Sequence, residues 1–289
     1  MQIQRHKIYG QSLRVFTWGS PKKPPIFMVH GWLDTGASFH FLAEVLKKDF
    51  YCIALDMRGY GKSSHAKDPL GYFFMQYVAD LKALIDDFFP KKDFYLMGHS
   101  LGGAVTSVYA AAFPERLKKL INLEGFVFRK HPDRGPERRL RQWMDKLEKG
   151  LSFPTHPSLA AFADRLCQRY VRFDKKRALF FAKHLTKKVP GGYKMAADPS
   201  HQVPEPYTIL PEVYYDYWKA IKVPCLFVVA EESEMGTWAG ISWKAFIKKQ
   251  AKYFPPKTQL LWVPDCGHMI PHEQPEFLAE RVLEFLRGE

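Results

Sequence analysis

A serine lies between two glycines in the pentapeptide GHSLG at residues 98–102. The apolar run before it, 93–97, predicts a short buried strand, and residues 103–105 predict the start of a helix. A turn this sharp between strand and helix tolerates only glycine at the neighbouring positions, and it pushes the serine hydroxyl up into a cleft. The pattern therefore predicts a nucleophile, Ser100. The alternative is a tight turn with an idle serine.

A nucleophilic serine needs a base, and His268 is the predicted one. It follows the apolar run 259–263, which predicts a strand, and precedes an amphipathic pattern over 272–286, which predicts a closing helix. The histidine is thus expected on a loop beyond the last strand and after the serine in chain order. The unperturbed pKa of an imidazole lies near neutrality, so His268 can take the serine proton. His272 is the nearest rival, but its place at a helix start favours a capping role.

The oxyanion formed by attack on a carbonyl needs hydrogen-bond donors. The apolar run 25–29 predicts a strand, and Gly31 after it lets the chain turn so that the amide of Trp32 faces the substrate. The amide of Leu101, at the start of the helix after the elbow, is the predicted second donor. Because both donors are backbone groups, we expect the Trp32 side chain to affect substrate fit more than oxyanion binding. Ordinary packing in the pocket wall is compatible with this role.

Four motifs together carry a family resemblance: HGW at 30–32, DMRGYGKS at 56–63, GHSLGG at 98–103 and GH at 267–268. Their order resembles that of the α/β-hydrolase superfamily, and they span nearly the whole chain. The fuller sequences HGWLD and RGYGKSSH resemble the serine hydrolase-like proteins, a branch near the haloalkane dehalogenases and epoxide hydrolases. The resemblance implies a Ser-acid-His hydrolase with a helical cap and no particular substrate. Those two neighbours use an aspartate at the elbow, so Ser100 argues against both chemistries.

The acid of the triad departs from the commonest pattern of the superfamily. Most relatives carry it a few residues after the penultimate strand, and the expected position here holds Ser233. The dehalogenase-like branch uses the end of the strand after the elbow helix, where this chain has Glu124. A carboxylate there can orient the imidazole and stabilise its charged form. We therefore predict Glu124 as the acid, with Glu234 and then Glu232 as alternatives. A junction residue paired with a basic side chain is the other interpretation of Glu124.

Three further charged residues fit structural roles better than catalytic ones. Asp56 ends the apolar run 51–55, and Arg58 follows it; a pair between them would tie the glycine-rich loop to the sheet. Asp34 lies two residues after the oxyanion tryptophan. We expect it to cap a helix that begins near Gly36, and lining of the pocket is the alternative.

Apolar runs and helical patterns alternate along most of the chain. Residues 3–9 and 13–18 predict an opening hairpin with a tight turn at Gly10-Gln11. The further predicted strands are 26–30, 51–55, 94–98, 119–123, 224–230 and 259–263, and the helical patterns include 39–46, 74–88, 101–113 and 242–254. Such alternation predicts an α/β fold with a mainly parallel twisted sheet, helices on both faces, and a cleft at the carboxyl ends of the strands.

One interval, 126–222, loses the strand pattern and predicts a helical cap. The expected organisation is a core in two parts, 1–125 and 223–289, with this cap inserted between them. The cap carries 20 Lys and Arg against 10 Asp and Glu, whereas the whole chain has 43 against 30. A basic lid can steer an anionic substrate or rest on an acidic surface, and solvated outer helix faces are the alternative. Its many aromatic residues suggest an apolar pocket.

Composition excludes several classes of protein. The 289 residues are 46% hydrophobic and suffice for one large core with an insertion. No apolar run is long enough to cross a bilayer, and the start lacks the apolar stretch of a secretory signal, so we expect a cytoplasmic protein without stable membrane insertion. The four cysteines form neither a disulfide framework nor a metal motif. No nucleic-acid recognition motif accompanies the positive charge. The proposed chemistry requires no metal or cofactor. The sequence does not indicate an oligomeric state.

Two classes of function fit these residues. In the first, a serine hydrolase of the carboxylesterase type cleaves a small acyl substrate, apolar or anionic, through an acyl-enzyme intermediate. Carbon–carbon bond hydrolysis uses the same triad and is a chemical alternative. In the second, the fold is a capped ligand-binding module or sensor with little turnover. The serine, histidine and oxyanion loop favour the first class.

Overall fold

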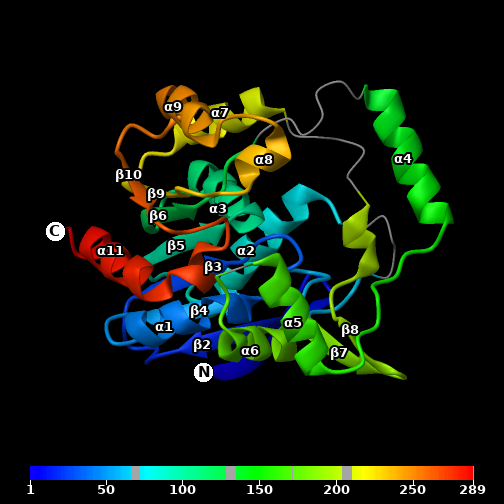
Figure 1. Cartoon of the computed structure of the whole chain (residues 1–289). Helices are drawn as coiled ribbons and strands as arrows, with labels where there is room; N and C mark the ends of the chain where they lie inside the picture. The colour runs from blue at the N-terminus through cyan, green and yellow to red at the C-terminus, as the bar shows by residue number, and fades with distance from the viewer. Residues whose placement is uncertain (67–71, 128–134, 171, 204–209, 289) are drawn as a thin grey trace.

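An eight-stranded sheet runs through the centre of the molecule, in the order β1-β2-β4-β3-β5-β6-β9-β10 (Figure 1). The computed structural model describes residues 1–66, 72–127, 135–170, 172–203 and 210–288. β1 is antiparallel to β2 and β2 to β4, and every other pair in the sheet is parallel. The mainly parallel sheet predicted from the sequence is confirmed. The strands are β1 Gln2–Ile8, β2 Gln11–Trp18, β3 Pro25–Val29, β4 Tyr51–Leu55, β5 Phe94–His99, β6 Leu117–Leu123, β9 Cys225–Ala230 and β10 Thr258–Val263.

The opening hairpin turns one residue earlier than predicted, at Tyr9 and Gly10. Both residues have positive φ, 47° and 75°. Two consecutive positive φ values are typical of a type I′ turn, whose twist matches that of the flanking strands. The predicted turn at Gly10-Gln11 was wrong because Gln11 already pairs with Ile8 in the register of the two strands.

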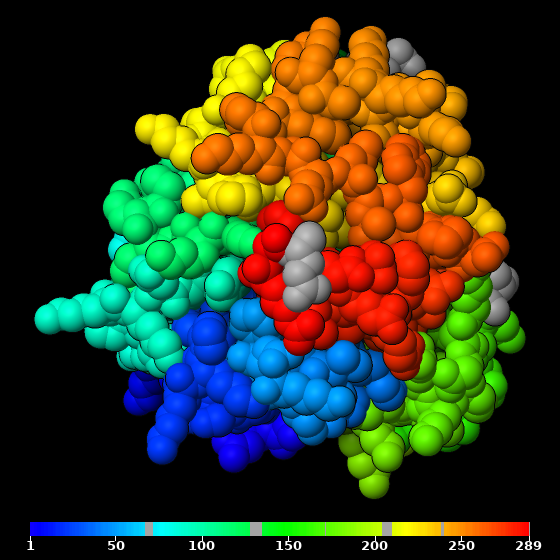
Figure 2. Space-filling view, turned by 90° about the vertical axis from the view of Figure 1, so that its left-hand side faces the viewer, coloured from blue at the N-terminus to red at the C-terminus, as the bar shows by residue number. Residues whose placement is uncertain are grey.

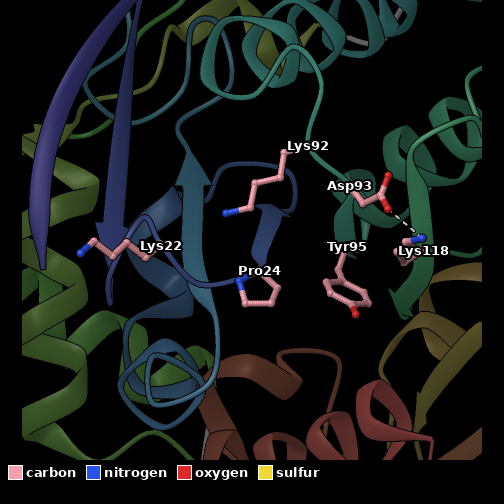
Figure 3. A pocket seen from close by; sticks show the side chains of 6 residues that line it. All are labelled: Lys22, Pro24, Lys92, Asp93, Tyr95 and Lys118. Atoms are coloured by element: carbon pink, nitrogen blue, oxygen red, sulfur yellow. Dashed lines mark ion pairs between the residues drawn. The ribbon is translucent and has the colours of Figure 1, made fainter.

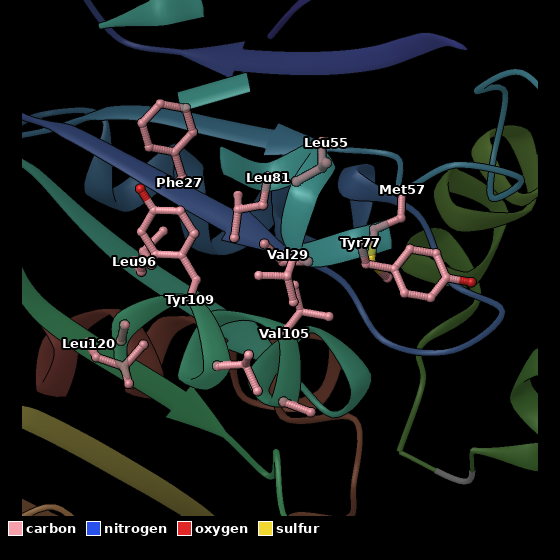
Figure 4. Packing of buried hydrophobic residues seen from close by; sticks show 14 of the residues in the cluster. Phe27, Val29, Leu55, Met57, Tyr77, Leu81, Leu96, Val105, Tyr109 and Leu120 are labelled. Atoms are coloured by element: carbon pink, nitrogen blue, oxygen red, sulfur yellow. The ribbon is translucent and has the colours of Figure 1, made fainter. Parts of the chain in front are cut away.

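Helices cover both faces of the sheet, as the alternating pattern predicted. Successive strand residues point to opposite faces, so Phe27 and Val29 join one core and Ile26 and Met28 the other. Figure 4 shows Val29 beside the helix residue Val105. Helices α2 Phe74–Phe88, α3 Leu101–Ala112, α7 Pro211–Ala220 and α9 Trp243–Gln250 supply the first core, and α1 His40–Leu46 and α11 Pro275–Arg287 supply the second.

The second layer is visible from the side in Figure 2, where α11 (red) lies against α1 (blue). The closing helix α11 begins at Pro275, not at His272 as predicted, because a separate short helix, α10 Ile270–Glu273, precedes it. Shorter helices elsewhere include η1 Gly36–Phe39, α8 Met235–Ala239 and η3 Ala251–Tyr253. Within the described ranges, no helix has the length and apolar character needed to cross a bilayer.

The interval 126–222 is not wholly helical. It holds α4 Pro136–Glu148, α5 Leu159–Arg169, α6 Lys175–Leu185 and the short η2 Pro199–Gln202, but also a hairpin of β7 Thr186–Val189 and β8 Gly192–Met195. The predicted inserted helical segment is confirmed, and the hairpin within it was not predicted because its strands have only four residues each, too few to show a period of two. Gly191 and Gly192 supply the positive φ values, 82° and 141°, at the turn.

The segments of this interval pack in two different places. Helices α5 and α6 enclose a small core of their own, which includes Phe162 and Phe181. Helix α7 packs against α3, and its Tyr214 and Trp218 are fully buried in the core of the sheet. Residues 128–134, 171 and 204–209 of the predicted cap lie outside the described residues. The division of the chain at 125 and 222 stays a prediction.

Candidate active site

Ser100 lies on a strained turn between β5 and α3. Its φ of 53° and ψ of −117° are rare for a residue other than glycine. The turn is possible because its flanks lack side chains. A Cβ on Gly98 would lie 2.2 Å from the carbonyl oxygen of Gly102, and one on Gly102 would lie 2.0 Å from that of Val29. This geometry presents the hydroxyl at the carboxyl edge of the sheet, as in a nucleophile elbow.

Hydrogen bonds join three side chains from distant parts of the chain. Nε2 of His268 lies 3.0 Å from Oγ of Ser100, and Nδ1 lies 3.0 Å from Oε2 of Glu124. An ionised carboxylate only accepts, so Nδ1 donates to Glu124 and Nε2 accepts from the serine hydroxyl. The structure thus brings together the predicted nucleophile, base and acid in the relay that a Ser-His-acid triad requires.

Glu124 is fully buried and held by several donors. Its Oε1 accepts from the backbone amide of Ala230 at 2.9 Å and from the indole of Trp243 at 3.2 Å. Its Oε2 accepts from the hydroxyl of Ser233 as well as from His268. Its backbone has a positive φ of 54° at the end of β6. The carboxylate is therefore fixed in one orientation, aimed at the imidazole.

Burial sets the direction of both pKa shifts in this pair. It lowers the pKa of His268 below its usual range, against the charges of Glu234 and Asp34, which raise it. Burial raises the pKa of Glu124, against the hydrogen bonds from Ser233 and the other donors. The lowered pKa of His268 keeps the imidazole neutral and able to accept a proton, and the four donors around Glu124 favour its ionised form against the effect of burial.

The two alternative acids lie elsewhere. Oε2 of Glu234 accepts from the backbone amide of His268 at 2.8 Å, so it contacts the loop and not the ring. Glu232 is exposed and pairs with Arg172. The structure therefore places Glu124, and neither alternative, at Nδ1 of the imidazole.

The predicted oxyanion loop contacts the serine through its glycine. A Cβ added to Gly31 would lie 3.2 Å from Cβ of Ser100, so the backbone next to Trp32 passes directly beside the nucleophile. His30 holds this turn, since its Nε2 accepts from the amide of Met57 at 3.0 Å and its Nδ1 donates to the carbonyl of Gly31 at 2.7 Å. On the other side, Leu101 is the first residue of α3, where backbone amides have no partner within the helix.

The side chain of Trp32 is half exposed, and its indole donates to the carbonyl of His201 at 3.0 Å. A cavity lies beside it, between the loops of the sheet and α5. Apolar side chains from both parts line it, among them Leu33, Met269 and Tyr170. Its lining also includes Trp32 itself and the polar residues Asp34, Arg169 and His272, and Met269 is the residue that follows His268 in the chain.

Two residues near this cavity do not have the predicted capping roles. Thr35, not Asp34, caps η1 with its side chain. Asp34 is buried, bonds Ser38 and lies 3.3 Å from Nε2 of His272. His272 is itself buried in α10 and packs against Phe173. The capping interpretations were wrong because these polar side chains pair with each other across 238 residues of sequence, which local patterns do not reveal.

The predicted pair of Asp56 with Arg58 is also wrong. Asp56 bonds Arg14, with Nε to Oδ2 at 2.6 Å, because β2 lies beside β4 in the sheet. Arg58 makes a bidentate pair with Asp80 of α2 instead, with both contacts at 2.6 Å. Asp56 also accepts from the backbone amide of Lys62 at 2.9 Å, which ties the glycine-rich loop to the sheet.

A second hollow lies at the opposite end of the sheet (Figure 3). Two of its three lysines are already engaged: Lys92 donates to the carbonyls of Pro21 and Lys23, and Lys118 pairs with Asp93 at 2.7 Å. Its residues lie before or at the amino ends of β3, β5 and β6, whereas Ser100 follows the carboxyl end of β5. In the described part of the chain, no group of three or more His, Cys, Asp or Glu is arranged to hold a metal ion.

The sequence did not reveal several residues that support the triad. Ser233 and Trp243 both donate to Glu124, and His99 donates from Nε2 to the carbonyl of His268 at 2.8 Å. A signal for Ser233 existed, because it occupies the position where most relatives carry the acid. Ser233 therefore occupies the usual position of the acid and donates a hydrogen bond to Glu124, the predicted acid of this chain.

The α/β-hydrolase fold family model matches residues 24–275. A serine hydrolase-like protein of Mus musculus is 40% identical over 111 residues, which is 38% of this chain and 35% of the mouse protein. The protein of the same name in Homo sapiens is 37% identical over 111 residues, covering 54% of its length. The chain thus spans only about a third to a half of these relatives.

Among solved structures, the thioesterase domain from the curacin biosynthetic pathway superposes with a TM-score of 0.89 at 22% identity, covering 98% of this chain and 99% of that domain. The resemblance predicted from the motifs is confirmed for the fold, and the similarity to the serine hydrolase-like proteins is confirmed over part of the chain. The chain belongs to the α/β-hydrolase fold family.

Proposed function

We propose that this chain is a serine hydrolase that cleaves a small carboxylic ester through an acyl-enzyme intermediate. The observation that carries the proposal is the unbroken chain of hydrogen bonds from Ser100 through His268 to Glu124, with both links at 3.0 Å. The names of the mouse and human relatives agree with it, although the match covers only part of either protein.

In the first half of the reaction, Oγ of Ser100 attacks the ester carbonyl carbon and its proton passes to Nε2 of His268. The imidazolium that forms is stabilised by Glu124 at Nδ1. Negative charge develops on the carbonyl oxygen, where the amides of Leu101 and Trp32 donate hydrogen bonds. The intermediate then collapses, the alcohol leaves with the proton from Nε2, and the acyl group stays on the serine.

In the second half, water enters on the side from which the alcohol left. His268 takes a proton from the water as its oxygen attacks the acyl carbon, and returns that proton to Oγ of Ser100 as the acid is released. No metal or organic cofactor takes part in this scheme. The walls of the cavity beside Trp32 are mainly apolar, which supports an apolar acyl group as substrate. We assign the cap over it to α5, α6 and β8, which contribute Leu166, Leu185 and Met195 to its lining.

Hydrolysis of p-nitrophenyl butyrate by the full chain tests the proposal. We expect turnover by the native protein and a fall of at least about 10³-fold in Ser100→Ala, to the background of the assay. Equal rates in the two proteins would contradict it, and so would a folded native protein that hydrolyses no ester in a series from acetate to decanoate. That second result would favour a binding module or a carbon–carbon bond hydrolase.

A further inference from the structure

The cavity beside Trp32 has polar groups in a wall that is otherwise mainly apolar. Asp34 lines it from the loop after β3, His272 from α10 and Arg169 from the last residue of α5. We call these three residues the polar wall. Charged and polar side chains next to an apolar space are costly unless they find partners, so their presence in a cavity points to a ligand with a matching polar group.

The charge of Asp34 is already engaged. Its carboxylate accepts from the hydroxyl of Ser38, and its Oδ2 lies 3.3 Å from Nε2 of His272. Burial acts to raise the pKa of Asp34, but the charge of His272 and the hydrogen bonds from His272 and Ser38 lower it to about 2. The carboxylate is therefore ionised and held by protein groups, so it does not select a cationic ligand.

His272 has one ring nitrogen without a partner. The side chain is buried and packs against Phe173 and Phe181. An ionised carboxylate only accepts, so Nε2 of His272 donates to Asp34. Nδ1 is also buried and has no hydrogen-bond partner among the residues that the structure describes. Such an atom needs a bond from a ligand or a water, and in the protonated ring Nδ1 can donate to an anion.

Arg169 is the cation of the polar wall that lacks an acidic partner. It is exposed, and within the described ranges it forms no ion pair, whereas Arg172 pairs with Glu232. Its guanidinium lies over the ring of Tyr170, 5.4 Å from the centroid, and both residues line the cavity. A basic residue at the end of a helix meets the negative end of the dipole. The fork of donors on the guanidinium stays available, and it matches a carboxylate in two parallel hydrogen bonds.

Two further carboxylates near the triad do not cancel this charge. Glu234 accepts from the backbone amide of His268 at 2.8 Å, and Glu273 accepts from that of Gly267 at 2.7 Å. Both are engaged by the loop that carries the base. Asp34 is the acidic residue that lines the cavity among the described residues, and His272 is its partner. The lining thus leaves one charge unpaired, and that charge is positive.

We propose that the polar wall binds an anionic group on the acyl chain of the substrate, so that the ester cleaved at Ser100 carries a carboxylate at the far end of an apolar chain. Cleavage rests on the proposed function, while binding of the carboxylate does not. Arg169 pairs with the carboxylate, and Nδ1 of His272 donates to it. Trp32 and Met269 belong to the loops that carry an oxyanion donor and the base, so an apolar chain in the cavity extends from the polar wall toward the triad.

Three p-nitrophenyl esters that differ only at the far end of the acyl chain test this specificity: the hydrogen suberate, the methyl suberate and the ester of 8-aminooctanoate. For the native chain we expect kcat/KM to be at least about tenfold higher for the acid than for the methyl ester, and lowest for the ammonium ester. Arg169→Gln should reduce the ratio of acid to methyl ester at least about tenfold, through KM, and Arg169→Lys should keep part of it.

The matched control is Arg165→Gln, which removes an exposed arginine one turn earlier in α5 that does not line the cavity. It should keep the native ratio. A ratio that is unchanged in Arg169→Gln, or that falls equally in both variants, would overturn the proposal. So would a native preference for the methyl or the ammonium ester.

Binding to the folded Ser100→Ala chain separates this inference from the proposed function. By calorimetry, we expect monomethyl suberate to bind at least about tenfold more tightly than dimethyl suberate, and Arg169→Gln in the same background to abolish the difference. Equal binding of the two ligands, or no binding of either, would overturn the inference even if the native chain hydrolyses esters. A native chain that hydrolyses none of the esters, although its Ser100→Ala variant binds the acid through Arg169, would refute the proposed function alone.

Discussion

Replacing Glu124 by glutamine tests the acid with almost no change of shape. Oε1 accepts from two N–H donors, Ala230 and Trp243, so the carbonyl oxygen of the glutamine must take that place. Its NH₂ group then takes the place of Oε2 and donates toward Nδ1 of His268. The imidazole is forced to accept at Nδ1 and to carry its hydrogen on Nε2, where it cannot take the proton of Ser100. In this variant His268 is held in the tautomer that cannot act as a base. The negative charge of Glu124, which stabilises the imidazolium, is also lost.

We expect Glu124→Gln to lower kcat by about 10⁴-fold, the cost of the equivalent change in a well-studied serine protease triad, which corresponds to about 5.4 kcal/mol of activation free energy. The assay is hydrolysis of p-nitrophenyl butyrate, with the urea midpoint measured to show that both variants fold. Glu234→Gln is the matched control. Its carboxylate accepts from the backbone amide of His268, and a glutamine carbonyl still can, so we expect a loss below about tenfold. Equal or reversed losses would refute the assignment of Glu124.

Three further predictions follow from the same contacts. The Glu124 carboxylate stabilises the imidazolium, so Glu124→Gln should lower the pKa of His268 further. The acid limb of the pH profile of kcat/KM for the residual activity of this variant should therefore move to lower pH. A limb at higher pH would contradict this. Trp32→Ala should change KM and acyl-chain preference but lower kcat less than tenfold, whereas loss of an oxyanion donor costs about 10²- to 10³-fold. Asp56→Ala should destabilise the fold by about 3–5 kcal/mol in urea unfolding because it leaves Arg14 buried and unpaired, whereas Asp216→Ala, at an exposed pair, should cost below about 1 kcal/mol. Similar losses at the two aspartates would contradict that ranking.

The sheet and the position of Ser100 could be predicted from the sequence because both depend on patterns of neighbouring residues. Apolar runs mark each buried strand, and close contacts such as that of Gly98 with Gly102 permit only glycine beside the elbow. The hairpin β7–β8 was missed because a strand of four residues shows no clear period.

Contacts between distant segments were harder to predict. The expected partner of Asp56 was its neighbour Arg58, but the sheet order brings Arg14 closer. Asp34 and His272 each suggested a local cap, and neither pattern indicates that the two residues meet. Glu124 was predicted only through a family resemblance, since no local feature separates it from Glu234. Side-chain pairing across the fold is set by topology, which short patterns do not encode.

The central claim is that the hydroxyl of Ser100 is a nucleophile activated by His268. Incubation of the folded chain with a fluorophosphonate probe, followed by peptide mass spectrometry, tests it most directly. We predict one adduct, on Ser100, formed rapidly in the native protein and about 10³-fold or more slowly in His268→Ala. A folded protein that stays unlabelled, or one labelled at Ser100 equally fast without the histidine, would contradict the account.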